Sequence, residues 1–252
     1  MTFSLERFDL PEMLRCGLDV RRETKESATM AEAAHAIVRY FYDGFVDDAT
    51  GERQCALVRF YKTHPYGGLP PDLRAFASGL MEGRAATEAM KCLVLLATAC
   101  AEPEWNSPRQ SRGHRAIPLP SVQIVEQAPM IAQLVREMGL DLDDVVSPRP
   151  ELIRGLEGKT YNVFYVADAQ GSPFIPAQDG FVKRYGIRSV IGCGGIHLTG
   201  DLYSLILFSR AQIPPESADR FRNVALDLKL AISRFRDDAV FAPPDPAEAL
   251  AG

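Results

Sequence analysis

Eight side chains of this 252-residue sequence have the chemistry of a small-molecule pocket, and they lie in two segments. They are Trp105, Asn106, Arg112 and His114 in the first segment, and Gln178, Phe181, Tyr185 and Arg188 in the second. Aromatic walls with a few convergent polar groups are typical of ligand sites. We predict that the two segments meet over one cavity. In the alternative, the tryptophan only anchors its own loop and Gln178 bonds to backbone.

The sequence gives little indication of metal-binding or catalytic histidines or of reactive cysteines. His114 has the imidazole needed to bind haem or a metal ion or to act as a base, but no His or Cys stands at short spacing beside it. The five cysteines are irregularly spaced without a CxxC, so we expect them to be reduced and mostly buried. Cys193 stands among glycines, where it is either a packing residue in a tight turn or a reactive thiolate.

No catalytic signature is present, since GxSxG, HExxH and P-loop patterns are all missing and GCGG does not fit the dinucleotide fingerprint. We assign no catalytic residue, no metal ligand and no cofactor. The formal net charge of −5 argues against nucleic acid and anionic membranes as partners, because both attract basic surfaces. Glu6, Arg7 and Asp9 interrupt any apolar leader, and the longest apolar run is half a membrane span, so we expect a cytoplasmic protein.

Hydrophobic periodicity supplies the elements that must position these side chains. It predicts helices at residues 30–46, 73–80, 129–139 and 215–236. It predicts strands at residues 53–63, 91–99, 161–167, 188–193 and 201–209, the last two forming a hairpin around a glycine-rich turn. The order favours an α+β fold, a central antiparallel β-sheet flanked by helices with a long terminal helix. We expect an N-terminal arm at 1–27, a single domain at 28–238 and a flexible tail at 239–252.

One segment carries a family resemblance. Residues 188–235, RSVIGCGGIHLTGDLYSLILFSRAQIPPESADRFRNVALDLKLAISRF, resemble the closing portion of GAF domains, in which a strand, a glycine-rich turn, a strand and a long helix follow in this order. The resemblance implies a small-molecule pocket over one face of the sheet and a terminal helix that transmits occupancy to a partner. GAF-like domains bind very different ligands, so the fold does not select one.

These observations predict a cytoplasmic, GAF-like sensor that binds a small molecule and signals to a downstream protein. The alternatives are a thiol-dependent reductase using Cys193 and an interaction scaffold that binds no ligand. We also predict a homodimer held by the helices at 30–46 and 215–236, because Leu226, Leu230 and Phe235 extend the apolar surface of the last helix beyond one narrow face. In the competing monomer, residues 3–18 fold over those leucines.

Overall fold

A computed structural model describes residues 2–111, 113–148 and 162–242. Its centre is a six-stranded sheet with strand order β3-β2-β1-β6-β5-β4, and every neighbouring pair is antiparallel. The predicted α+β class with a central antiparallel sheet is confirmed. The strands are β1 (Cys55–Pro65), β2 (Lys91–Cys100), β3 (Ala116–Leu119), β4 (Phe164–Val166), β5 (Ser189–Ile196) and β6 (Leu202–Ser209).

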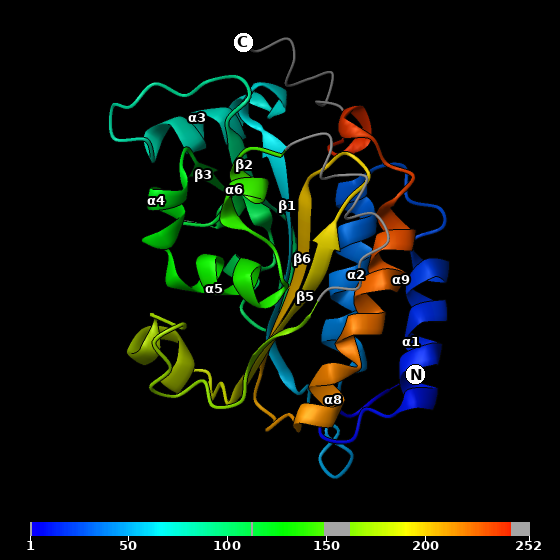
Figure 1. Cartoon of the computed structure of the whole chain (residues 1–252). Coiled ribbons are helices and arrows are strands. Elements are labelled where there is room, and N and C mark those ends of the chain that lie inside the picture. The colour runs from blue at the N-terminus through cyan, green and yellow to red at the C-terminus, as the bar shows by residue number, and fades with distance from the viewer. Residues whose placement is uncertain (1, 112, 149–161, 243–252) are drawn as a thin grey trace.

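Helices α1 (Leu10–Glu23), α2 (Met30–Gly44) and α9 (Phe221–Ile232) cover one face of the sheet (Figure 1). Asp9 and Glu12 form a reciprocal capping box at the start of α1, which satisfies backbone N–H groups that the helix leaves unpaired. Thr29 caps the start of α2, where its side chain accepts from the backbone N–H of Glu32. The helix predicted from residue 30 is therefore confirmed.

Helix α1 runs parallel to α9. Near the starts of the two helices, Asn223 contacts the sulfur of Met13, and beyond their ends Arg234 donates to the carbonyl of Thr24. The predicted terminal helix is present but divided, because α8 (Pro215–Asp219) ends before α9 begins.

The opposite face of the sheet carries shorter elements joined by loops (Figure 1). They are α3 (Pro71–Gly79), α4 (Val122–Glu126), α5 (Pro129–Glu137) and α6 (Leu142–Val146), with the single turns η2 (Pro103–Trp105), η3 (Pro108–Gln110) and η4 (Gln178–Lys183). Strand β3 lies at the sheet edge, in a segment where no strand was predicted. Its Pro118 cannot donate to a neighbouring strand, which fits an edge position.

The glycines of GCGG lie inside strand β5 and not in a turn, which corrects the sequence interpretation. The turn comes later, where His197 pairs with Asp201 and Gly200 has a φ of 84°. A side chain at position 194 would place its Cβ 2.0 Å from the carbonyl oxygen of Tyr203. The glycine therefore allows a close approach between β5 and β6.

Both ends of the described chain contribute to the core. Phe3 and Phe8 are buried with Phe45 and Phe221, and Val240 is buried beyond the last helix. Residues 243–252 of the expected tail and residue 161 of an expected strand lie outside the described residues.

Candidate functional site

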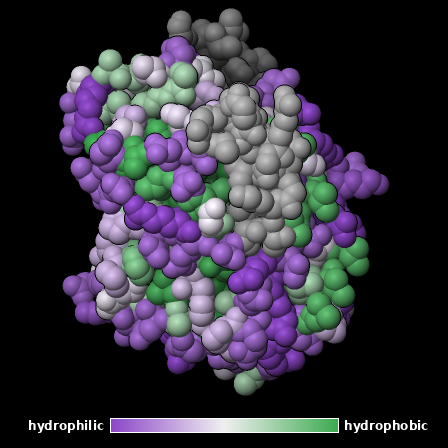
Figure 2. All heavy atoms as spheres, viewed as in Figure 1, coloured by the Kyte–Doolittle hydropathy of each residue, from purple (hydrophilic) through white to green (hydrophobic). Residues whose placement is uncertain are grey.

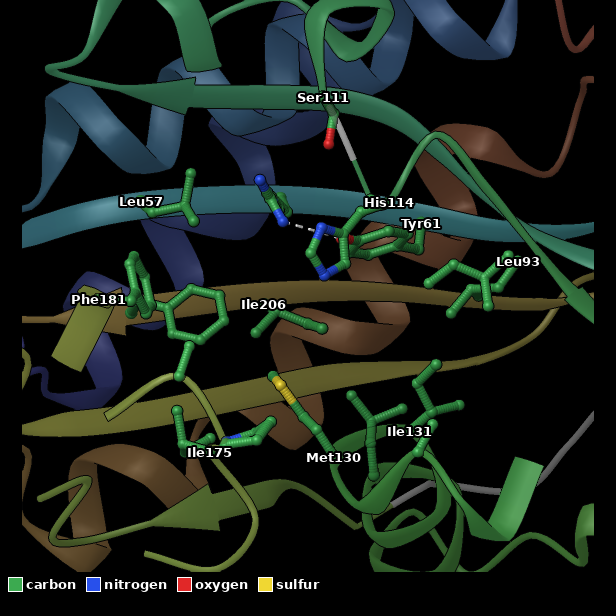
Figure 3. A pocket seen from close by; sticks show the side chains of 18 of the residues that line it. Leu57, Tyr61, Leu93, Ser111, His114, Met130, Ile131, Ile175, Phe181 and Ile206 are labelled. Carbon is green, nitrogen blue, oxygen red and sulfur yellow. Dashed lines mark hydrogen bonds between the residues drawn. The ribbon is translucent and has the colours of Figure 1, made fainter. Parts of the chain in front are cut away.

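A cavity of about 790 Å³ lies on the face of the sheet opposite α2 and α9 (Figure 3). Its floor consists of alternate residues of the two central strands, β1 and β6, because successive strand side chains point to opposite faces. The floor residues are Leu57, Arg59, Tyr61, Leu202, Ser204, Ile206 and Phe208. The residues between them, such as Phe60 and Leu205, are fully buried.

Three segments close the cavity above this floor. The first follows β2 and contributes Trp105, Ser111 and His114; the second is the start of α5, with Met130 and Ile131. The third segment precedes and includes η4, and it contributes Ile175 and Phe181. The side chains of Met130, Ile131, Ile175 and Phe181 point into the space in Figure 3. Apolar walls of this kind bind a ligand mainly by removing its apolar surface from water.

Arg59 is the one cation among the described residues that line the cavity. It stands in the middle of the sheet, with Thr98 of β2 and Ile206 of β6 as its neighbours across the strands. Its Nη1 donates to the hydroxyl of Tyr61 at 3.3 Å, the contact drawn as a dashed line in Figure 3. The Nε atom is buried without a partner among the described residues, as is the hydroxyl of Thr98.

His114 borders the cavity and is accessible from it, yet enough protein surrounds the ring to change its titration. Burial, together with the nearby charge of Arg59, lowers the pKa of His114 to about 4. The imidazole is therefore neutral near pH 7, with one nitrogen that donates and one that accepts. The hydroxyl of Ser111 also points toward the cavity (Figure 3).

The structure brings Trp105, His114 and Phe181 to this one cavity, although they come from both predicted segments. Tyr185 packs against Trp105 with ring centroids 5.1 Å apart, outside the set of lining residues. Trp105 also contacts Phe181, so the aromatic side chains join the two segments. The role of these residues in ligand binding stays a prediction.

Asn106, Gln178 and Arg188 are not among the residues that line the cavity. Asn106 bonds to the backbone N–H and carbonyl of Cys100 and holds the end of β2. Gln178 accepts from the N–H of Gly171 and donates to the carbonyls of Ala169 and Ile175, the backbone role given above as the alternative. Arg188 has an exposed side chain, and Arg112 lies outside the described residues.

Sequence reasoning missed the strand residues that form the floor, above all Arg59 and Tyr61. A signal was present, since an arginine inside the apolar run of β1 faces either solvent or something that needs a charge.

A second polar cluster lies at the end of β1, where Lys62 is fully buried. Asp201 accepts from Lys62 at 2.7 Å and from Lys91 at 2.6 Å. Burial alone would raise the pKa of Asp201, but the two lysines lower it to about 2. Lys62 also lies 3.5 Å from Asp237, so the cluster ties the segment after α9 to the sheet.

Thiol and metal chemistry finds no support in the described part of the chain. The five cysteines are unpaired and buried, and burial raises the pKa of Cys193 far above its usual value, so the thiol stays protonated. No group of three or more His, Cys, Asp or Glu side chains that suits a metal ion occurs within residues 2–111, 113–148 and 162–242. Over the same residues, no helix has the length and apolarity needed to cross a bilayer.

No family model and no curated protein sequence matches this chain. Among solved structures, it is similar to the GAF domain of a phosphoenolpyruvate-protein phosphotransferase from Coxiella burnetii, with 12% identity and a TM-score of 0.45. That match covers 88% of this chain and 92% of the other. A second similar structure is the phycoerythrobilin-bound GAF domain of a cyanobacterial phytochrome, with 13% identity, a TM-score of 0.39 and coverage of 88% and 94%. Both belong to the family that residues 188–235 resemble.

Proposed function

We propose that this chain is a cytoplasmic GAF-like sensor module that binds a small molecule and passes its occupancy to a downstream protein. The observation that carries the proposal is the cavity of about 790 Å³ over the two central strands, walled by apolar side chains. Its volume lies within the range of known small-molecule sites, roughly 300–1,000 Å³.

Strand β6 offers a route for the signal, because it contributes to the floor of the cavity and also contacts α9. Ser204 faces the cavity, and its neighbour Tyr203 faces the helices, where its hydroxyl donates to the carbonyl of Ala225 in α9 at 2.8 Å. A ligand that displaces β6 would therefore displace α9 as well, because packed interiors transmit small shifts.

The reductase alternative is not favoured, because its nucleophile is inaccessible. Cys193 is fully buried and protonated, and the residues that line the cavity do not include it. Thiol exchange requires a thiolate that the oxidised substrate can reach.

We also propose that the module works as a homodimer through α1 and α9. Helix α2, which was predicted to take part, carries none of the exposed large apolar side chains, and Phe235 is buried. Leu10, Leu14 and Leu18 are exposed along α1, and Leu226 and Leu230 are exposed on the adjacent α9. We name these five residues the leucine surface; apolar side chains gather over α1 and α9 at the right edge of Figure 2. Helix α1 lies beside the leucines of α9 and leaves them uncovered, so a second copy related by a two-fold axis would bury both rows in a four-helix contact.

Binding of a neutral apolar probe tests the cavity directly. We expect 1-decanol to bind the purified protein in calorimetric titration, and Ile206→Trp to weaken binding at least about 10-fold by filling the space above β6. Glu26→Trp adds the same ring at an exposed position away from the cavity and should leave binding unchanged. Equal binding by both variants would place the probe outside the cavity and refute the site.

A further inference from the structure

We infer that the ligand of this cavity is an organic acid with an apolar body, and that its carboxylate pairs with Arg59. This inference rests on the proposed function, since it names the ligand class of the same cavity. Arg59 lies on the floor of a cavity whose lining is mainly apolar, and this placement of a charge costs free energy. Charged groups in apolar surroundings are normally paired, because the surroundings replace few of the interactions lost with water.

Arg59 has no such pair among the described residues. None of their carboxylates forms an ion pair with it, and its only hydrogen bond goes to the neutral hydroxyl of Tyr61. The other charged residue that lines the cavity, Glu104, has an exposed side chain. The floor of the cavity therefore holds one positive charge that no described anion balances.

The hydrogen-bonding groups around Arg59 suit an anion. Tyr61 accepts from Arg59, which leaves its own hydroxyl hydrogen free for a ligand oxygen. Thr98 lies opposite Arg59 on the neighbouring strand β2. Its hydroxyl is buried and has no partner among the described residues. His114 and Ser111 add groups that donate as well as accept, whereas the guanidinium itself only donates.

The charge count favours a carboxylate over a doubly charged phosphate. One guanidinium balances one negative charge, and His114 contributes none near pH 7 because it is neutral there. The planar fork of an arginine also matches the two oxygens of a carboxylate. Away from Arg59, the walls are formed by Met130, Ile131, Ile175 and similar side chains, which suit the apolar body.

The test compares two probes of equal length, decanoate and 1-decanol, by calorimetric titration. The wild-type protein should bind decanoate about 10- to 100-fold more tightly than decanol, because only the acid makes a charge-assisted pair with Arg59. Arg59→Met keeps the unbranched stem of the side chain and removes the charged guanidinium. It should abolish the preference for the acid while still binding decanol, which also shows that the variant is folded.

A second readout separates a ligand contact from a structural role. Without ligand, Arg59→Met should melt at the same temperature as the wild type or higher, because it removes a half-buried charge that no described anion balances. Arg59→Lys, which keeps the charge without the fork, should retain part of the preference for decanoate.

The outcomes distinguish this inference from the function on which it rests. Binding of decanol without a preference for decanoate, or a preference that survives in Arg59→Met, would refute an organic acid paired with Arg59 as the ligand. The cavity would remain a binding site. Failure of the wild-type protein to bind either probe would overturn both proposals.

Discussion

Lys62, Lys91 and Asp201 concentrate the charge of the interior at one end of the sheet. One carboxylate serves two ammonium groups there, and Thr199 donates a further hydrogen bond to it at 2.7 Å. In such clusters the attraction between the charges offsets the free-energy cost of removing them from water. When one partner is lost, that cost is no longer offset for the remaining charges. Asp201 is therefore the residue on which this cluster depends.

Replacement of Asp201 by Asn should destabilise the protein by about 3–5 kcal/mol, because it removes the buried carboxylate that Lys62 and Lys91 share and leaves Lys62 only the more distant Asp237. Urea denaturation followed by circular dichroism measures this change. Asp43→Asn is the control, since Asp43 also bridges two basic residues, Arg39 and Arg53, but at the surface. It should cost no more than about 1 kcal/mol, and an equal loss in both variants would contradict the special role of the buried cluster.

Stability should fall in two steps as the solution becomes acidic. Burial, assisted by Lys62, lowers the pKa of His64 from 6.5 to about 4, whereas Asp201 and Asp237 oppose this shift. Between these two values the unfolded chain takes up a proton that the folded chain refuses, so stability falls as pH falls from 6.5 to 4, by about 3 kcal/mol. Burial also lowers the pKa of His197 and adds to the loss in the same direction.

Asp201 produces the second step. Its folded pKa of about 2 lies below its usual 3.8, so its contribution is complete above pH 3.8 and is lost as pH falls toward 2. Denaturation midpoints measured from pH 7 to 2 should show both steps, and His64→Gln should reduce the upper one. His35→Gln, at an exposed position, should leave the profile unchanged. A flat profile between pH 6.5 and 4 would show that buried histidines do not control the upper step.

At the scale of elements, strands β5 and β6 depend on glycine for their close approach. The Cβ of an alanine at position 194 would meet the backbone oxygen of Tyr203 at 2.0 Å and the Cα of Ser204 at 2.8 Å, and backbone atoms cannot move aside cheaply. At position 192 the nearest atom is a methyl group of Leu134 at 3.0 Å, which can rotate. Gly194→Ala should therefore cost about 1–3 kcal/mol more than Gly192→Ala in chemical denaturation. Similar losses would mean that the strands separate easily.

Elements with strong periodicity were predictable from the sequence, and those defined by distant contacts were not. Helix α2 has a capping threonine and a regular apolar stripe, and β6 is a long apolar strand that pairs with its neighbour in the chain. Strand β3 is only four residues long and contains Pro118, so its local sequence resembles a loop. The glycines of β5 indicated a turn, but Gly194 instead admits the backbone of β6, which the sequence of β5 alone does not reveal.

The cavity was predictable only in part for the same reason. Aromatic residues in irregular segments indicated that Trp105 and Phe181 belong to one region, and the structure places both at the cavity. Gln178 and Asn106 have the chemistry of ligand contacts, but they bond to backbone within their own loops. The isolation of Arg59 from carboxylates could not be predicted from the sequence, because it depends on the register of β1 with its two neighbouring strands.

At the scale of the whole molecule, the sheet separates two surfaces with different chemistry. The cavity lies on one face, and α1, α2 and α9 cover the other. The leucine surface lies on the outer side of that helix layer, so the strands and α9 connect the cavity to the proposed dimer contact. Because a ligand shifts an equilibrium only through its different affinities for two states, ligand-dependent dimerisation would require a second arrangement of α9.

The double variant Leu14→Glu/Leu230→Glu tests whether the leucine surface pairs two copies. Both positions are exposed, so the substitutions should leave the fold intact and weaken dimerisation at least about 100-fold, because each copy would present two buried negative charges to its partner. Analytical ultracentrifugation over a range of concentrations measures the effect. Leu80→Glu is the matched control, since Leu80 is an exposed leucine beside the cavity and should leave the dimer unchanged. A wild-type protein that stays monomeric at high concentration, or a double variant that still dimerises, would show that the leucine surface does not join two copies.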